Sequence, residues 1–250
     1  MTNTPTYTTD LLVRQLTSED LATRFDAASL IGMDGVTGAA DALVERLGTE
    51  TDCQVRERVT WATVRVIDAA LPGLLTALES SRPEIRMQAA HVLSKAARPE
   101  FAEHLEAVVG DTDAAVAIKG YRAAANTGDP RVIAWLTARL GDGDPHQRDA
   151  LTNAFVTLGE PAVAALVTAL DDDRTAVRAH AAEALGHVAI GTCVAITALR
   201  VAAADVDPEV RLVATTALGE LGADASDALA ALRTSADPRV AAVASALLAA

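Results

Sequence analysis

Hydrophobic residues recur along the chain in a pattern that fits one face of a helix. In the segment Val177–Val188, small or apolar residues stand three, four, six and seven positions after Arg178, with polar residues between them. This spacing predicts an amphipathic α-helix that buries one stripe. The same pattern recurs along the chain from a starting residue that we call the anchor. The anchors are Arg24, Arg56, Arg86, Ala117, Arg148, Arg178, Arg211 and Ala241.

The anchors are nearly evenly spaced, with successive steps of 32, 30, 31, 31, 30, 33 and 30 residues. Self-similarity at a fixed period of this size is the signature of a repeat architecture. The sequence therefore predicts a single repeat domain over residues 1–250 that contains about eight copies. The predicted copies are 8–34, 36–67, 70–97, 99–127, 130–158, 161–190, 191–222 and 224–250.

Each copy is expected to form two helices. An aspartate four residues before the anchor is suited to cap the second helix, because its carboxylate accepts backbone N–H groups. Six copies carry it, as Asp20, Asp52, Asp113, Asp144, Asp207 and Asp237. Shorter apolar stretches such as Arg131–Leu140 and Ala162–Leu170 predict the first helices. A single pair cannot bury its stripe alone, so the pairs should stack into an all-α solenoid.

Composition agrees with this architecture and narrows the function. The chain has 55 alanines and 3% aromatic residues, which suits thin helical layers without a large shared core. The net charge of −13 makes nucleic acid and anionic membranes unfavourable partners. Two cysteines and an N-terminus without an apolar leader lead us to expect a cytoplasmic protein. Phosphate-binding loops, nucleophile elbows and zinc-protease motifs are absent from the sequence, so we predict no enzymatic activity and no cofactor.

The segment Asp207–Gly219 reads Asp-Pro-x-Val-Arg-x-x-Ala-x-x-Ala-Leu-Gly. This pattern resembles the HEAT repeat, and the short period is similar to the bacterial HEAT-like repeats named from phycobilisome (PBS) lyases. The resemblance implies a right-handed superhelix of about eight antiparallel helix pairs with the second helices on its concave face. It also implies a ladder of ion pairs between each anchor arginine and an aspartate six residues earlier, matched here by Asp142, Asp172 and Asp205. Copies one to three lack that aspartate. Family members mostly act as scaffolds or adaptors.

Positions two, five and nine after each anchor should face the concave groove. In copies two to four these positions hold a cluster of basic and aromatic residues, although the protein is acidic overall. The candidate partner-binding residues are Arg58, Trp61, Arg65, His91, Lys95, Lys119 and Arg122. Arginine offers forked donors to carboxylate or phosphate, and tryptophan offers an apolar, cation-binding surface. We therefore predict a non-catalytic scaffold that captures an acidic protein or peptide. The competing interpretation is an ordinary solvated helix face.

Two enzymatic alternatives use the same groove. HEAT-like DNA glycosylases and phycobilin-lyase-like enzymes are both similar in fold to the predicted solenoid. HEAT-like di-iron hydroxylases are disfavoured, because the sequence contains no His-Glu pair.

Two further features allow alternative interpretations. His180, Glu183 and His187 share one helix face in copy six and, with Glu220, form either a metal site or a solvated polar surface. The last helix is apolar on nearly every face, which raises the possibility of self-association through it.

Overall fold

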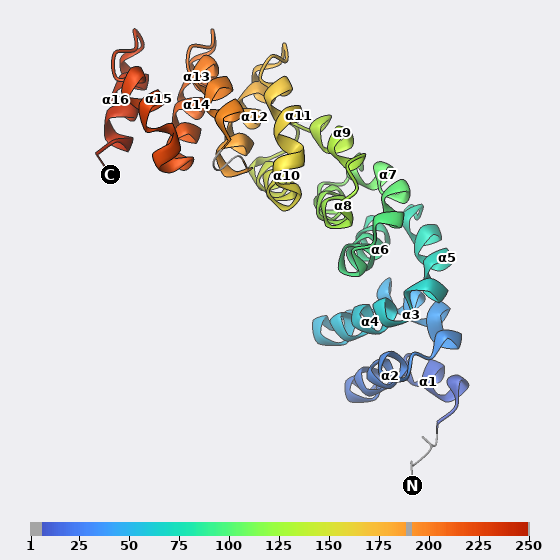
Figure 1. The fold of residues 1–250 in the computed structure, drawn as a ribbon. Coiled ribbons are helices and arrows are strands. Elements are labelled where there is room, and N and C mark those ends of the chain that lie inside the picture. The colour runs from blue at the N-terminus through green and yellow to red at the C-terminus, as the bar shows by residue number, and fades with distance from the viewer. Residues whose placement is uncertain (1–6, 189–191, 250) are drawn as a thin grey trace. The chain divides into compact units, whose positions relative to one another are not determined.

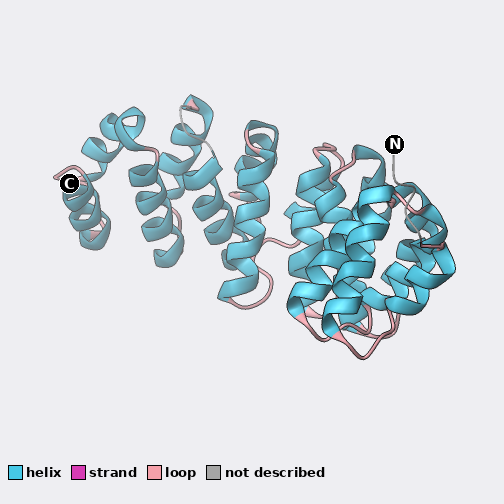
Figure 2. Cartoon of the chain, turned by 90° about the horizontal axis from the view of Figure 1, so that it is seen from below, coloured by secondary structure: helices cyan, strands magenta, loops and turns pink. Residues whose placement is uncertain are grey.

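A computed structural model describes residues 7–188 and 192–249, and all regular structure in these residues is helical (Figures 1 and 2). The elements are α1 (Thr9–Gln15), α2 (Leu21–Asp34), η1 (Thr37–Ala39), α3 (Ala40–Leu47), α4 (Cys53–Arg65), α5 (Ile67–Leu78), α6 (Pro83–Ala96), η2 (Pro99–His104), α7 (Glu106–Val109), α8 (Ala114–Thr127), α9 (Val132–Thr137), α10 (Pro145–Leu158), η3 (Glu160–Ala162), α11 (Val163–Ala169), α12 (Thr175–Val188), α13 (Cys193–Ala202), α14 (Pro208–Glu220), η4 (Gly222–Ala225), α15 (Ser226–Leu232) and α16 (Pro238–Leu247).

The chain forms two compact units, residues 1–123 and 124–250, which we describe separately. In the first unit, α2, α4, α6 and the start of α8 lie side by side, and α1, α3, α5 and α7 cover them from one side (Figure 1). In the second unit, α10, α12, α14 and α16 form the corresponding layer, covered by α9, α11, α13 and α15. We call the layer of longer helices in each unit the second-helix layer. The all-α fold of paired helices is thus confirmed.

The second helices begin where the aspartates predict. All six predicted capping aspartates accept a backbone N–H from the first turn of their helix, for example Asp52 from Gln54 and Val55 and Asp144 from Gln147. The remaining caps differ, since α6 follows Arg82 and begins at Pro83 without a side-chain cap.

The predicted stripe is the buried face of these helices. In copies two to seven, every position three, four, six and seven after the anchor is buried, as for Leu151, Thr152, Ala154 and Phe155 in α10. Small residues let neighbouring helices approach closely, and Gly120 in α8 is one such case, where the neighbour is backbone. A Cβ at Gly120 would lie 2.6 Å from the carbonyl oxygen of Val108. The small side chains anticipated from the composition therefore have a direct role in packing.

Four of the six anchor arginines form a partial ladder of ion pairs, but its rungs differ from the predicted ones. Each rung joins an anchor to an acidic residue of the following copy, with donor–acceptor distances of 2.7–3.1 Å. The rungs are Arg24–Glu50, Arg86–Asp111, Arg178–Asp205 and Arg211–Asp237. The Nη1 group of the anchor donates instead to a backbone carbonyl six residues earlier in its own copy, as from Arg211 to Asp205.

The predicted pairing of each anchor arginine with an aspartate of its own copy was therefore wrong. Asp205 binds the arginine of the preceding copy, while Asp172 pairs with Arg174 and Asp142 with Arg139. The expectation that copies one to three lack rungs was wrong for copies one and three, where Glu50 and Asp111 supply the carboxylates. It holds for copy two, since Arg56 makes no ion pair within the described residues and donates to the Glu50 backbone carbonyl. The cause is geometric, since an arginine at the start of a second helix reaches across to the turn of the next stacked pair.

Among the described residues, no single helix is long and apolar enough to cross a membrane. Two sharply bent pairs, Cys53–Arg65 with Ile67–Leu78 and Pro145–Leu158 with Glu160–Ala169, meet the criteria of length and composition only when each pair is taken together.

Candidate partner-binding face

The predicted basic residues gather on the second-helix layer of the first unit. We call the surface of α4, α6 and α8 formed by Arg58, Trp61, Arg65, His91, Lys95, Lys119 and Arg122 the basic face. Trp61, Arg65, Lys95 and Arg122 are exposed, whereas the remaining members are half-buried. Four of these seven predicted positions are thus exposed, which agrees with their spacing along the helices.

Arg58 and Trp61 are organised by contacts with α2. The guanidinium of Arg58 lies over the ring of Phe25 at 4.6 Å and over the ring of Trp61 at 5.2 Å, measured to the ring centroids. Trp61 is 37% exposed and packs against Gly32, where an added Cβ would lie 2.2 Å from the indole atom Cζ3. Arg65 Nε donates to the Gly32 carbonyl at 3.3 Å. These side chains are held in place before any partner binds.

His91 occupies the middle of the basic face. Its Nε2 lies 3.3 Å from Glu57 Oε1, and its Nδ1 is buried without a hydrogen-bond partner. Burial lowers the pKa of His91 below its usual value, and the nearby charges of Lys119 and Lys95 lower it further, while Glu57 opposes them. His91 therefore favours its neutral form.

The three cations of α6 and α8 are available to a ligand. Lys95, Lys119 and Arg122 make no hydrogen bond or ion pair with any other residue in the described parts of the chain. The nearest acidic residues along the second helices are Glu57 on α4 and Asp26 at the equivalent position of α2. Counting Arg58 and Arg65 as well, this surface carries five permanent positive charges against two negative ones, within a unit whose residues sum to −6.

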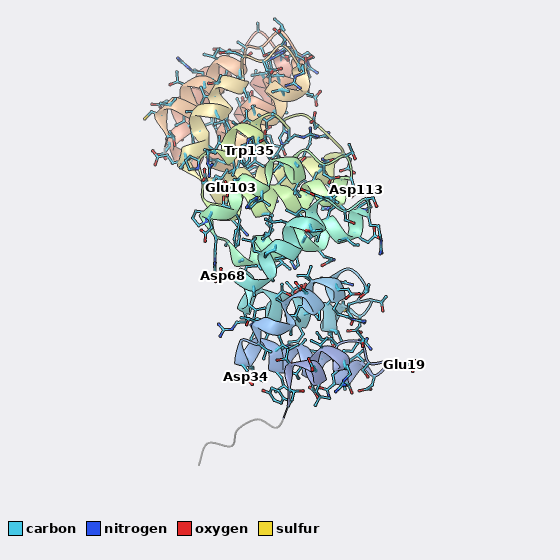
Figure 3. The ribbon with its side chains drawn as sticks, turned by 90° about the vertical axis from the view of Figure 1, so that its right-hand side faces the viewer. Glu19, Asp34, Asp68, Glu103, Asp113 and Trp135 are labelled. Carbon is cyan, nitrogen blue, oxygen red and sulfur yellow. The ribbon has the colours of Figure 1, made fainter. Side chains whose placement is uncertain are left out.

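Many of the acidic groups of the first unit lie at its edges rather than on the basic face. Glu19 and Asp113, in the turns that lead into α2 and α8, project along one edge of the stacked pairs (Figure 3). Asp34 and Asp68 project along the opposite edge, where second helices end and first helices begin (Figure 3). These four carboxylates therefore lie apart from the cations of the basic face.

The candidate metal residues do not come together. His180 is 2% exposed and points into the protein, where Nδ1 accepts from the Gly141 backbone N–H and Nε2 contacts Thr152 Oγ1, both at 3.1 Å. Its predicted place on the groove was wrong, because this ring fills the space between α12 and α10. Within residues 7–188 and 192–249, no group of three or more histidine, cysteine, aspartate or glutamate side chains is arranged to hold a metal.

A cleft of about 340 Å³ lies on the second-helix layer of the second unit, between α12 and α14. It is lined by Glu183, His187, Leu212, Val213, Thr216, Ala217 and Glu220. Its two carboxylates, Glu183 and Glu220, were predicted on this surface as members of the candidate metal site. The cleft itself could not be predicted, because the depth of the gap depends on how closely two neighbouring helices pack.

The C-terminal helix α16 buries Val240 and Ala244 and exposes mainly small residues. Leu248, just after α16, is 38% exposed and is the single large hydrophobic residue exposed in the described part of this segment. Self-association through this helix stays a prediction.

Comparison with known proteins places the chain among helical repeat proteins. A family model described as HEAT repeats matches residues 105–186 and 163–249. No protein of curated function matches the sequence.

Several solved structures share the fold. Kap121p bound to Pho4p is 15% identical with a TM-score of 0.58, over 96% of this chain and 33% of Kap121p, so the chain spans about a third of that protein. YibA of Escherichia coli is 18% identical with a TM-score of 0.50, over 97% and 93% of the two chains. The complex of CpcE and CpcF of phycocyanin lyase from Nostoc sp. PCC7120 is 24% identical with a TM-score of 0.44, over 98% and 97%. At these identities the likeness concerns the fold alone.

Proposed function

The chain belongs to the HEAT-repeat family, and from this premise we propose that it is a non-catalytic scaffold that captures an acidic protein segment on its basic face. The single observation that carries the proposal is the group of cations Lys95, Lys119 and Arg122 on α6 and α8, which are unpaired within the described residues and share the second-helix layer with the exposed ring of Trp61 on α4. An extended acidic segment would place its carboxylates on these cations and an apolar side chain on the indole.

The arrangement favours a protein partner over a reaction. Catalysis needs a nucleophile or an acid–base group positioned in a water-excluded site. The basic face is an open helical surface, and its one titratable group near neutrality, His91, has Nε2 engaged by Glu57. Two of the similar structures hold Kap121p with a bound partner, Pho4p or Nup53p, which are examples of binding by a protein of this fold.

Binding of a defined acidic probe tests the proposal. Fluorescence anisotropy would follow a fluorescein-labelled nine-residue peptide of aspartate and glutamate with a central leucine, at low salt. The triple variant Lys95→Gln, Lys119→Gln and Arg122→Gln should bind at least about tenfold more weakly than the wild type, since each surface ion pair contributes up to about 1 kcal/mol.

A matched control separates a site from bulk charge. The variant Arg14→Gln, Arg200→Gln and Arg233→Gln removes three exposed cations that lie outside the second-helix layers. Its affinity for the peptide should change less than about twofold, because distant exposed charges are screened. Equal losses in the two triple variants, or no binding by the wild type, would overturn the proposal.

The same titration addresses the nucleic-acid alternative. A labelled 15-nucleotide single strand should bind more weakly than the acidic peptide, because the total charge of −13 repels a polyanion beyond the basic face. If the strand bound more tightly than the peptide, and if the Lys95, Lys119 and Arg122 variant lost this binding, the partner of the basic face would be a nucleic acid and not a protein.

A further inference from the structure

One cleft on the second-helix layer of the second unit is lined by charges of the sign opposite to that of the basic face. The cleft between α12 and α14 is bordered by the carboxylates of Glu183 and Glu220, and no lysine or arginine lines it. Neither carboxylate takes part in an ion pair or a side-chain hydrogen bond within the described residues. Two unneutralised carboxylates thus face one cleft.

The floor of the cleft is apolar and shallow. Leu212 and Val213 are half-buried, and Ala217 is buried beneath them. The helices approach so closely at Gly186 that an added Cβ would lie 2.9 Å from the Cα of Ala217, which closes the cleft from below. A volume of about 340 Å³ is at the low end for a small-molecule site and suits one or two side chains.

We propose that this cleft binds a lysine or arginine side chain of a partner protein. The aliphatic stem of such a residue would cover Leu212 and Val213, and its cationic head would lie between Glu183 and Glu220. Long basic side chains combine these two properties, whereas an acidic or purely apolar segment would leave the carboxylates unpaired or repel them. This proposal is independent of the acidic partner of the basic face, because the two surfaces belong to different units.

A basic peptide tests the proposal on the whole protein. The probe is a fluorescein-labelled Gly-Lys-Val-Arg-Lys-Gly peptide, compared with its counterpart in which glutamate replaces each cation. The variant Glu183→Gln with Glu220→Gln should bind the basic peptide at least about fivefold more weakly than the wild type, with unchanged helicity by circular dichroism.

The matched control removes the same charge elsewhere in the unit. Glu160→Gln with Asp224→Asn changes two exposed acidic residues that do not line the cleft. Less than a twofold change in this variant, together with the loss in the first, would support the site. Equal weakening in both variants would overturn it, as would a wild type that fails to prefer the basic peptide.

Two additional measurements identify the occupant. Val213→Ser leaves both carboxylates in place. It should still weaken binding of the basic peptide, because the aliphatic part of the bound lysine or arginine loses an apolar contact. Full retention of affinity would contradict the proposed mode of binding. In sedimentation velocity without peptide, the wild type and the variant Glu183→Gln with Glu220→Gln should have the same sedimentation coefficient, and hence the same oligomeric state. Self-association abolished by these substitutions would assign the cleft to a second copy of the chain and overturn the proposal of a separate partner.

Discussion

The Nδ1 atom of His180 accepts a hydrogen bond from the backbone N–H of Gly141, 3.1 Å away. A backbone N–H can only donate, so Nδ1 carries no proton and the neutral ring holds its hydrogen on Nε2. That hydrogen is directed to Thr152 Oγ1, which lies 3.1 Å from Nε2. The ring thus connects α12 to the turn before α10 and to α10 itself, and only in its neutral form.

Protonation of His180 should therefore destabilise the second unit. Burial lowers the pKa of His180 to about 4, from an ordinary value of 6.5. As pH falls below 6.5, His180 is protonated in the unfolded chain but stays neutral in the folded protein. The free energy of unfolding therefore declines between pH 6.5 and 4 and is constant at lower pH. The shift corresponds to about 3 kcal/mol.

The measurement is chemical denaturation between pH 7.5 and 4, for the wild type and for His180→Asn. The variant should be less stable at pH 7.5, and its difference from the wild type should shrink toward pH 4. His146→Asn, which changes an exposed histidine of α10, provides the control and should follow the wild type. If the difference in unfolding free energy between His180→Asn and the wild type stayed constant over this pH range, the two hydrogen bonds would not depend on a neutral His180 ring.

The same direction of pH dependence, over a lower pH range, is expected for Glu50, which joins two consecutive copies in the first unit. Burial raises the pKa of its carboxyl, but hydrogen bonds from Arg24, the Asp52 backbone N–H and Arg46 outweigh burial and lower it to about 2. The stabilisation is therefore complete above the ordinary value of 4.5 and is lost as pH falls from 4.5 to 2.

Glu50→Gln should cost about 3–5 kcal/mol of unfolding free energy at pH 7, because it leaves buried Arg24 without its counter-charge. Denaturation at a series of pH values should show this cost declining between pH 4.5 and 2. Glu45→Gln, at an exposed position of the same helix α3, serves as the control and should have little effect. A cost for Glu50→Gln of less than about 1 kcal/mol would show that this rung contributes no more than a surface pair.

These two residues illustrate what the sequence can and cannot predict. The aspartate caps and the buried stripe follow from local chemistry and helical periodicity, and both were confirmed in detail. The partners of Glu50 and His180 lie in neighbouring copies, so they depend on how one helix pair stacks on the next. A rule based on offsets within one copy therefore assigned the ladder acids to the wrong arginines and placed His180 on the surface.

The basic face was easier to predict than the cleft. Its positions are those that a single helix exposes, so periodicity alone located Trp61, Lys95 and Arg122. The contacts that orient them were not predictable in the same way. Trp61 lies over Gly32 of the preceding copy, and this depends on a residue 29 positions earlier that happens to lack a side chain.

The stacking of Arg58 between Phe25 and Trp61 leads to a prediction that separates structure from binding. A lysine at this position keeps the charge but lacks the planar group that stacks on rings. Arg58→Lys should lower the unfolding free energy by about 1 kcal/mol, the size of a half-buried cation–π contact, and should shift Trp61 emission to the red as the indole becomes more solvated. Phe25→Leu removes one of the rings without changing any charge and should reproduce the stability loss.

Affinity for the acidic peptide should fall less than about twofold in Arg58→Lys, because Lys95, Lys119 and Arg122 remain. A large loss of affinity with unchanged stability would instead make Arg58 a direct contact of the partner.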